Sequence, residues 1–522
     1  MKHHIRFSQL PEFAMRLEDV TATLEYLKAR EGPPATWLQQ PDAIGGLSDA
    51  GKQALGSLAE AMAGFDHASK PWPTLCHLLL DRTRIAARIA ASDRVVDRTR
   101  GIAIWQLMNF IRVQPGGKGL PITRLLDRIR RLVRLRDERD LRQLPAAAQG
   151  LDAVRLSTIH GAKGLEFPVV HLPGLNQDTI PRAFQKPDCP YPEHMVEGTE
   201  LLPLDNLLEG HKEEQECLFY VALSRAKDRL FLYACTQKSG GSSRPLSPFV
   251  ARLGGSIDQQ HRPDARQLPT APQDAPVAVQ IDGPMRFSAS EIQLYDSCPR
   301  RFLYTYMLRT GGRRTSTPFM LTHDVVQEVM QWIFEATEPI DEAAIEARLD
   351  EAIAASELGR HGYVTDFRLL AMGMLRYLQS IRTGRASESA TALTIRFGQE
   401  ELTVVPDEVS VSASGQRTLR KIRTGHKRSK EHNDWAAAAF QLAAQRAFPD
   451  AVVELVHLAD EAVTTLKLSK TEMSNRHEKL AEVLEKVRNG RFPTKASDFT
   501  CPKCPAFFIC GPLPDGVIVK NF

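Results

Sequence analysis

The chain of 522 residues contains 43% hydrophobic and 25% charged residues, a composition typical of globular proteins. Its length predicts three or four domains of about 150 residues each. No apolar run reaches about 18 residues and the first residues lack a secretory signal, so a membrane span and export are excluded and a cytoplasmic protein is expected. The 67 basic and 63 acidic residues nearly cancel, so net charge alone does not indicate a nucleic-acid partner.

Residues 14–150 carry apolar side chains at spacings of three and four residues, which predicts a series of helices. The segments are LEDVTATLEYLKAR, DAGKQALGSLAEAM, GIAIWQLMNFIRV and ITRLLDRIRRLVRLRDERDLRQL. The last segment is rich in arginine, but its apolar residues form one stripe: Leu125, Ile129, Leu132 and Leu135. We therefore interpret the arginines as a solvated helix face, with contact to DNA as the alternative.

The periodicity changes after residue 153. VRLSTIH predicts a short strand, GAKGLEF a turn and PVVHLPGL a buried strand, and EEQECLFYVALSRAKDRLFLYAC predicts a helix followed by a strand. This order suits a parallel α/β sheet. Residues 254–286 are rich in Pro, Gly, Ser and Gln, and we interpret them as a linker between domains.

Residues 287–522 predict a second α/β unit. Helices are expected from SASEIQLYDSCPRRFLYTYML to about residue 383, and at DWAAAAFQLAAQRAF and KTEMSNRHEKLAEVLEKVRNG; strands are expected at TALTIRF, ELTVVPDEVSVSA, RTLRKIRTG and AVVELVHLA. The unit ends in CPKCPAFFIC, a C-x2-C-x5-C pattern that favours a metal over a disulfide in a cytosolic chain. The isolated cysteines are interpreted as buried free thiols: Cys76, Cys189, Cys217 and Cys235.

The segments VRLSTIHGAKGLEFPVV and EEQECLFYVALSRAKDRL resemble the fifth and sixth motifs of UvrD/Rep-type superfamily 1 DNA helicases. The resemblance implies a helical 2B-like subdomain over 1–150 and a RecA-like 2A lobe over 151–253, in an ATP-dependent motor of the 3′→5′ type. It implies that Arg225 is an arginine finger, which places a cation on the γ-phosphate held by the opposing lobe. By the same resemblance Glu166 faces the nucleotide ribose or a metal, Thr158 and His160 contact a strand phosphate or base, and Lys163 lies in the same loop.

Two departures from this family affect the expected activity. The family usually carries Glu-Arg-Arg-Leu where this chain reads Gln215, Glu216, Cys217 and Leu218, so part of the nucleotide contacts differ. The sequence also lacks both G-x-x-x-x-G-K-[ST] and an acidic D-E-x-Q strand, so the first motor lobe is missing. We therefore expect ATP and Mg²⁺ to bind only together with a first lobe, supplied by a partner protein or by further N-terminal sequence.

Residues 287–522 resemble the PD-(D/E)XK nuclease domain of RecB-type exonucleases, in the branch that carries an iron–sulfur cluster. The resemblance rests on FSASEIQLYDSCPRRFLY and GRFPTKASDFTCPKCPAFFICG, and it implies a [4Fe–4S] cluster on Cys298, Cys501, Cys504 and Cys510. Such a cluster would tie the first helix of the domain to its last loop. Tetrahedral zinc is the alternative metal, and four unligated thiols are a third interpretation.

The nuclease family places a His on an early helix, an Asp at the end of one strand and D-x-K on the next, where the His and the carboxylates bind Mg²⁺. His323 matches the first position and Asp407 the second. In RTLRKIRTGHK, Lys421 stands at the second metal carboxylate and Arg423 at the lysine position. A cation in place of a metal ligand repels a divalent ion, so we expect a degenerate, inactive site.

The same stretch is strongly basic. Residues 413–430 contain seven Lys or Arg and no acidic residue: Arg417, Arg420, Lys421, Arg423, Lys427, Arg428 and Lys430. We interpret the last strand and its loop as a DNA-binding surface formed by Lys421, Arg423, Lys427 and Arg428, with a solvated basic loop as the alternative. Glu400, Glu401 or Glu408 could supply the lost carboxylate from a shifted position.

The sequence thus predicts a DNA-processing component of a UvrD-like helicase–nuclease, acting on a single strand or a duplex end in repair or phage defence. Its expected partners are DNA and a protein that carries the first motor lobe. Two alternatives stay open: a Mg²⁺-dependent exonuclease component with an active site, and a non-catalytic DNA-binding scaffold.

Overall fold

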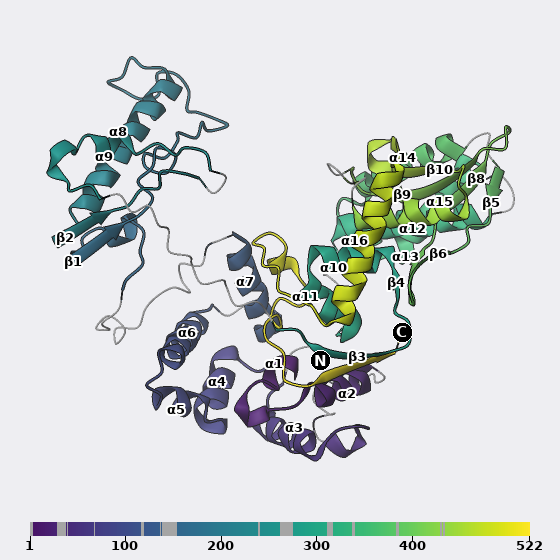
Figure 1. The fold of residues 1–522 in the computed structure, drawn as a ribbon, viewed down its shortest axis with the longest axis horizontal. Coiled ribbons are helices and arrows are strands. Elements are labelled where there is room, and N and C mark those ends of the chain that lie inside the picture. Colours follow the sequence, from purple (N-terminus) through teal and green to yellow (C-terminus); the bar gives the residue numbers. More distant parts are fainter. Residues whose placement is uncertain are drawn as a thin grey trace. The chain divides into compact units, whose positions relative to one another are not determined.

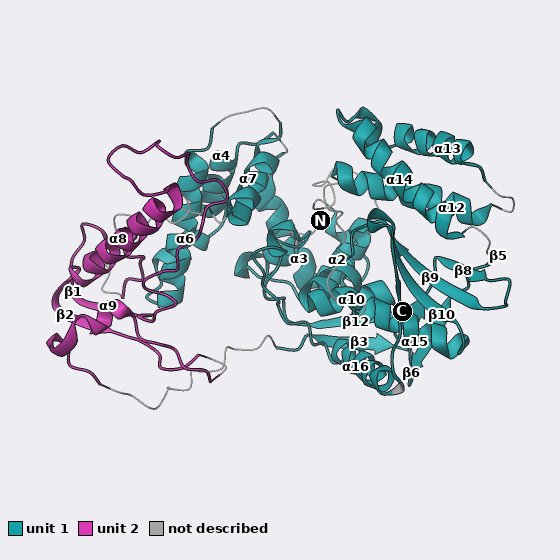
Figure 2. Cartoon of the chain, turned by 90° about the horizontal axis from the view of Figure 1, so that it is seen from above, with its two compact units in different colours: residues 1–148, 271–522 teal, residues 149–270 magenta. Residues whose placement is uncertain are grey.

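The computed structural model of the chain describes residues 4–28, 38, 40–66, 68–115, 119–135, 137, 154–238, 241–260, 275–310, 317–336, 340–382, 386–427, 431 and 434–521. The chain forms two compact units (Figure 2): unit 1 comprises residues 1–148 and 271–522, and unit 2 comprises residues 149–270. Unit 2 is therefore inserted into the sequence of unit 1. No helix in the described ranges is long and apolar enough to span a membrane.

The N-terminal part of unit 1 is helical, as the three- and four-residue spacing predicts. Its helices are α1 (His4–Phe7), α2 (Leu17–Lys28), α3 (Asp49–Met62), α4 (Pro71–Cys76), α5 (Ile85–Ala90), α6 (Val95–Arg112) and α7 (Pro121–Leu135). Ser48 caps α3 by accepting a hydrogen bond from the Gly51 N–H, and its hydroxyl donates to the buried Asp19 carboxylate of α2 at 2.8 Å. One polar contact thus begins α3 and fixes it against α2.

The C-terminal part of unit 1 is an α/β fold (Figure 1). Its helices are α10 (Ala289–Ser297), α11 (Pro299–Phe302), α12 (Pro318–Glu335), α13 (Glu342–Ala355), α14 (Val364–Arg382), α15 (Trp435–Ala447) and α16 (Lys470–Arg488). Its strands are β3 (Ala278–Asp282), β4 (Arg286–Ser288), β5 (Ala386–Glu388), β6 (Leu393–Phe397), β7 (Glu400–Val404), β8 (Glu408–Val411), β9 (Arg417–Arg423), β10 (Val452–His457), β11 (Ala462–Thr465) and β12 (Val517–Asn521).

The main sheet of unit 1 has the strand order β11-β10-β9-β8-β5, and only its β9–β10 pair is parallel. A second sheet has the order β4-β7-β6, and β3 pairs with β12 in parallel. One hydrophobic core joins the N-terminal helices to this α/β part, since Leu17 and Leu55 are buried in the same cluster as Ile518. A second core fills the space between α12, α13 and α14, around Val326 and Leu375.

Unit 2 consists of β1 (Phe167–Leu172), α8 (Pro203–Leu223), β2 (Ala226–Leu232) and α9 (Pro248–Ala251). The two strands are parallel, with Val170 opposite Leu230. Proline at the first position of α8 and of α9 suits a helix start, where its missing N–H costs no hydrogen bond. Phe219 of α8 stacks on Phe249 of α9 at 5.4 Å between ring centroids, in a small core with Leu172 and Leu175.

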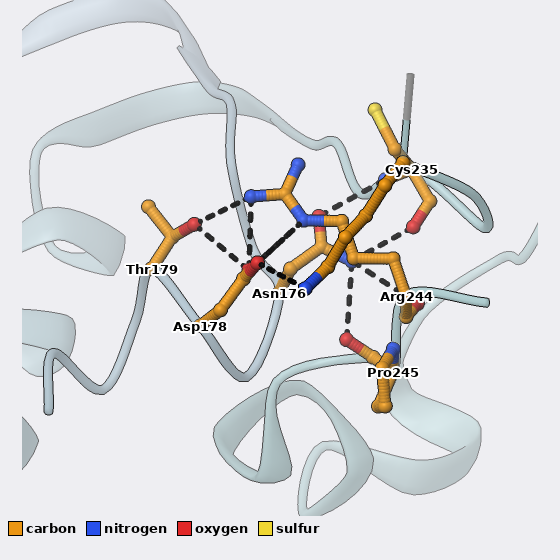
Figure 3. A network of polar contacts seen from close by, with 7 residues as sticks. Asn176, Asp178, Thr179, Cys235, Arg244 and Pro245 are labelled. Carbon is orange, nitrogen blue, oxygen red and sulfur yellow. Dashed lines mark hydrogen bonds and ion pairs between the residues drawn. The ribbon is translucent and has the colours of Figure 1, made fainter. Parts of the chain in front are cut away.

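A buried asparagine holds the segments that follow the two strands of unit 2 (Figure 3). The Asn176 side chain donates to the Cys235 carbonyl at 2.8 Å and to the Pro245 carbonyl at 3.1 Å, and it accepts from the Cys235 N–H at 3.1 Å. Beside it Arg244 donates to Asp178 at 2.9 Å, and this contact lowers the pKa of the Asp178 carboxyl. Asn176 therefore satisfies backbone groups that neither strand can pair.

The structure differs from the sequence-based expectations in three places. Residues 278–282 lie inside the expected linker 254–286 but form β3, because β12 supplies a partner strand from the far end of the sequence. Residues 154–158, expected as a strand, are described and form no regular structure. Of the helices expected as a subdomain of the motor half, α1 to α3 contribute to a core shared with the α/β part of unit 1, and all of residues 1–148 belong to unit 1.

Candidate functional site

Two residues set the conformation of the loop between residues 158 and 166 of unit 2: Thr158, through its side chain, and Gly164, through its backbone. Thr158 Oγ1 accepts a hydrogen bond from the Gly161 N–H at 3.0 Å, and the chain then makes a single 3-10 turn over His160–Ala162. Gly164 follows with φ of +81°, a conformation that residues with a side chain rarely adopt. The loop exposes Thr158, His160 and Lys163 together.

Arg225 fastens this loop to the end of α8. Its guanidinium donates to the Leu165 carbonyl and to the Val221 carbonyl, each at 2.9 Å, and to the Ser224 hydroxyl at 2.9 Å. The backbone N–H of Phe167, next to Glu166, donates to the Arg225 carbonyl at 2.9 Å. The structure thus brings Arg225 and Glu166 together, with the exposed Glu166 carboxylate 3.4 Å from Lys227.

The residues that depart from the helicase pattern have structural roles in unit 2. Gln215 is buried, and its side-chain oxygen accepts from the Arg182 N–H at 2.8 Å. Glu216 pairs with Arg252 at 2.7 Å, whereas the thiol expected to be buried at Cys217 is exposed. Two further thiols expected to be buried, those of Cys189 and Cys235, are also exposed.

In unit 1, Asp407 and Lys421 meet at the β8–β9 pair. The Lys421 ammonium lies 2.5 Å from Asp407 Oδ1, and Asp407 Oδ2 accepts from the Ile422 N–H at 2.6 Å. Both carboxylate oxygens are therefore occupied by donors of the chain itself. An ammonium group stands where a divalent cation would have to approach this carboxylate.

The glutamates considered as replacement ligands are also engaged. Glu408 is buried and pairs with Arg382 at 2.6 Å and with the buried Arg420 at 3.1 Å. Glu400 accepts from Arg488 at 2.7 Å and from the Met285 N–H at 2.6 Å, and Glu401 pairs with Arg286 at 3.2 Å. A shifted metal ligand at any of these positions would first have to break an existing pair.

The basic stretch of β9 is largely neutralised by carboxylates. Arg417 pairs with Glu388 at 3.0 Å, Arg420 with Glu454 at 2.8 Å and with Glu408, and Arg423 with Glu431. Lys427 is exposed, whereas Arg428 and Lys430 lie outside the described residues. Within the described part, Lys427 is thus the basic residue of this stretch that is most available to a phosphate.

His323 does not contact Asp407 through any hydrogen bond in the described part of the chain. It lies on α12 with its ring against Phe319 at 4.2 Å, and burial together with the nearby His426 lowers its pKa. The sequence interpretation missed a neighbouring cluster in which buried His457 pairs with buried Glu431 at 2.8 Å and His426 with Asp460 at 2.6 Å. His457 lies opposite Arg423 in the parallel pair of β9 and β10. Predicting this strand pair from the sequence would have placed His457 near the candidate nuclease site.

The four cysteines expected to bind metal converge in unit 1. Cys298 ends α10, and the other three follow α16 in a loop with a 3-10 turn at Cys501–Lys503. Burial raises the pKa of Cys504 and of Cys510, and Cys298 and Cys501 are close enough to raise both pKa values further. In the described ranges, however, no three Cys, His, Asp or Glu side chains are arranged closely enough to hold a metal ion. Four thiols are a suitable ligand set for a metal centre, but in this structure their side chains lie farther apart than the ligands of one metal ion do.

Two family models match separate segments of the chain. Residues 114–237 match the UvrD-like helicase C-terminal domain, and residues 286–511 match the PD-(D/E)XK nuclease superfamily. The chain joins a UvrD-like helicase C-terminal domain to a PD-(D/E)XK nuclease domain. The mixed α/β fold with parallel strand pairs agrees with both domains.

Several curated relatives carry similar segments. ATP-dependent DNA helicase PcrA of Bacillus subtilis is 30% identical over 125 residues, which cover 23% of this chain and 14% of the relative. Two relatives that are named as components of an ATP-dependent helicase/nuclease match longer segments. That of Geobacillus thermodenitrificans is 30% identical over 214 residues, covering 33% of this chain and 17% of the relative. That of Pelotomaculum thermopropionicum is 24% identical over 320 residues, covering 53% and 25%. The chain therefore spans a quarter or less of the length of these relatives.

The helicase-like match and the compact units do not share a boundary. The UvrD-like match begins at residue 114 and so includes α7, which belongs to unit 1. There the Arg130 guanidinium lies 4.8 Å from the ring centre of Phe508, in the cysteine loop of the PD-(D/E)XK domain. The nuclease-superfamily match covers residues 286–511, so β3 lies before it and β12 after it. Helix α7 thus packs one end of the helicase-like sequence against the nuclease-like domain.

Proposed function

We propose that this chain is a DNA-processing component of an ATP-dependent helicase–nuclease. It contributes the second motor lobe, with Arg225 as arginine finger and Glu166 beside the nucleotide, and a nuclease-like domain that holds DNA without cutting it. ATP and Mg²⁺ bind between unit 2 and a first lobe carried by a partner protein or by further N-terminal sequence. Thr158, His160 and Lys163 contact the translocating strand.

The pair between Lys421 and Asp407 carries the proposal of an inactive nuclease. Hydrolysis in this superfamily needs a carboxylate pair to hold Mg²⁺, and here the Lys421 ammonium lies 2.5 Å from Asp407, the carboxylate that matches the family pattern. The three glutamates that could replace the lost ligand are engaged in other pairs. Lys427 and Arg428, which follow β9 in the sequence, remain as the proposed phosphate contacts, assisted by Lys421 and Arg423.

Exposed apolar residues of unit 2 support the proposal that a first motor lobe binds to it. Val169 of β1 and Phe231 of β2 are each more than two-fifths exposed, and Val154 and Leu156 are almost fully exposed. Val169 lies two residues from His171, the strand partner of Phe231, so these two exposed apolar side chains are on the same face of the strand pair, as is typical of an interaction surface. A first motor lobe that packs against this surface would also bring its nucleotide toward Arg225.

Degradation of linear DNA tests the inactive nuclease. In the full assembly with Mg²⁺ or Mn²⁺, we expect Asp407→Ala to leave the rate of nucleotide release unchanged, because this carboxylate binds no metal. The same assembly is expected to retain linear DNA with an affinity that falls steeply with salt. Cleavage that is present in the wild type and lost in Asp407→Ala would show an active exonuclease, which is the alternative function.

We further propose that Cys298, Cys501, Cys504 and Cys510 hold a [4Fe–4S] cluster. Their common location supports this proposal, and so do the neighbouring Arg301 and Arg300, whose charges oppose the rise in the pKa of Cys504 and Cys510 respectively. Cys298, Cys501 and Cys504 are half-buried, and Cys510 is exposed. A bound cluster would link α10 to the loop after α16 and so close a long loop of the chain.

Protein prepared without oxygen is expected to be brown and to contain about four irons per chain. Replacing Cys504 by Ser should remove the iron and lower the unfolding midpoint of unit 1, because the link between α10 and the last loop is lost. Replacing the isolated Cys76 by Ser is the matched control and should change neither quantity. Zinc in place of iron in elemental analysis would contradict this proposal.

A further inference from the structure

Helix α7 of unit 1 has a strongly one-sided charge. It carries five arginines and one aspartate over 15 residues, and none of its residues is fully buried. Its positive charge therefore equals the formal net charge of the whole chain, which is +4. The helix α16, by comparison, carries five Lys or Arg and four glutamates. Acidic residues balance the basic ones on α16, as is usual for a solvated helix face, whereas they do not on α7.

The apolar stripe of α7 is covered by the protein. Leu125, Ile129 and Leu132 are each partly buried. Next to this stripe the Arg130 guanidinium lies over the ring of Phe508, and Figure 1 shows α7 beside the cysteine loop that contains this ring. A basic amphipathic helix that binds a membrane surface inserts its apolar side among the lipids. Here that side already has a protein partner, so the surface that α7 offers is its charged one.

Three arginines of α7 lie on the exposed side of the helix. Arg128, Arg131 and Arg134 follow one another at a spacing of three residues, so they share one side of the helix. Arg131 and Arg134 form no hydrogen bond or ion pair within the described part of the chain. Arg128 lies 6.0 Å from the ring centre of the buried Phe110, a contact that leaves its charge without a counterion.

The carboxylate of α7 does not neutralise these three side chains. Asp127 lies 3.9 Å from a different arginine, Arg130. On the neighbouring helix α6, by contrast, Arg98 and Arg100 each pair with an aspartate, at 2.9 and 3.1 Å. The exposed arginines of α7 are therefore a local excess of positive charge. A polyanion that binds such a surface gains free energy because it releases its own counterions.

We propose that this arginine face of α7, formed by Arg128, Arg131 and Arg134, binds the phosphate backbone of duplex DNA. Arginine binds phosphate through two parallel hydrogen bonds, and side chains three residues apart are neighbours that can reach successive phosphates. Helix α7 has no aromatic residue on which the bases of a single strand could stack, and this favours a duplex. The sequence left DNA contact open as the alternative for these arginines.

The choice of DNA among polyanions rests on the proposed function, whereas the charge of the surface does not. The arginine face belongs to unit 1, so its binding of a duplex requires neither a nucleotide nor the loop at residues 158–166 of unit 2. It also requires no metal at the nuclease-like site. The two ideas can therefore fail separately.

Fluorescence anisotropy of the full chain, with a duplex and with a single strand of the same length, tests the inference. Replacing Arg128, Arg131 and Arg134 together by Gln should weaken duplex binding at least about tenfold near 0.1 M salt. The slope of log K against log[salt] should fall by about 2 to 3, since each lost phosphate contact removes about 0.9. Single-strand binding should change less, because the loop at residues 158–166 is unaltered.

Replacing Arg94, Arg98 and Arg100 of α6 together by Gln is the matched control. It removes the same charge from the same part of unit 1, but each of these arginines is paired with an aspartate. Duplex affinity should therefore stay within about twofold of the wild type. Replacing the three arginines of α7 by Lys should preserve the salt slope, because the positive charges remain.

Several results would overturn the inference while the proposed function stands. These are wild-type duplex affinity and salt slope in the glutamine variant of α7, an equal loss for duplex and single strand, and an equal loss in the α6 control. Vesicles of phosphatidylcholine and phosphatidylserine provide a further comparison. Binding to these vesicles that exceeds binding to the duplex, and that is lost in the glutamine variant of α7, would identify a membrane surface instead.

Discussion

Replacing Arg225 by Ala is expected to lower DNA-stimulated ATP hydrolysis by about 10³-fold in the assembly with a first motor lobe. The guanidinium would stabilise charge on the transferred phosphoryl group, and alanine supplies no cation at that point. The binding of single-stranded DNA should change less than turnover, because the hydrogen bond from the Gly161 N–H to Thr158 Oγ1 within the loop does not involve Arg225. Steady-state turnover and DNA affinity, measured on the same preparation, separate the two effects.

The contacts of Arg225 require a control, because the side chain also fastens the loop to α8 through Leu165 and Val221. Arg229→Ala removes an exposed arginine from β2 of the same unit and should leave turnover within a few-fold of the wild type. The chain alone should hydrolyse no ATP above background. Hydrolysis by the isolated chain that disappears in Arg225→Ala would contradict the assignment of the nucleotide to another lobe.

Replacing Arg420 by Met is expected to destabilise unit 1 by roughly 3 to 5 kcal/mol, the cost typical of breaking a buried ion pair on one side. Arg420 is 2% exposed and donates to Glu454 at 2.8 Å and to Glu408 at 3.1 Å. Removing it leaves two carboxylates with less compensation inside the main sheet. Hydrogen exchange of the β9 and β10 amides reports the loss in unit 1 without interference from unit 2.

Arg417→Met is the matched control, because Arg417 lies on the same strand and also pairs with a glutamate, but at the surface. Exposed pairs contribute about 0 to 1 kcal/mol, so this variant should be close to the wild type. Replacing Arg420, Glu408 and Glu454 together by Met should recover part of the stability, since of these pairs only the less deeply buried Arg382 then lacks its carboxylate. Equal protection in Arg420→Met and Arg417→Met would show that the buried network contributes little.

Local signals in the sequence predicted much of the fold and placed the candidate sites. The motif around Thr158 and the strand–helix–strand order of unit 2 depend on residues that are near one another in sequence, and the structure has β1, α8 and β2 where they were expected. The location of Asp407 and Lys421 at one site on adjacent strands was also expected, whereas the ion pair between them was not predicted. Short-range periodicity and loop chemistry contain this information.

The rest depended on contacts between residues that are distant in sequence. β3 was assigned to a linker because AVQID alone is a weak strand, and only its pairing with β12 makes it one. The basic stretch of β9 was interpreted as DNA-binding because the sequence does not show Glu388, Glu431 and Glu454 beside it. Residues 154–158 have the alternation of a strand but gain no partner among the described residues.

Because unit 2 is inserted into the sequence of unit 1, the ribosome completes the synthesis of unit 2 before that of unit 1. Residues 149–270 are complete, and free to fold, while the second part of unit 1 has yet to be translated. At that stage the buried face of α2 lacks part of its packing, because Ile518, which belongs to the same core, and the rest of β12 have not yet been synthesised. A nascent chain stalled before Val517 therefore exposes the apolar face of α2, although unit 2 has already been synthesised. Such stalled products should be preferred clients of chaperones and should aggregate when chaperones are depleted.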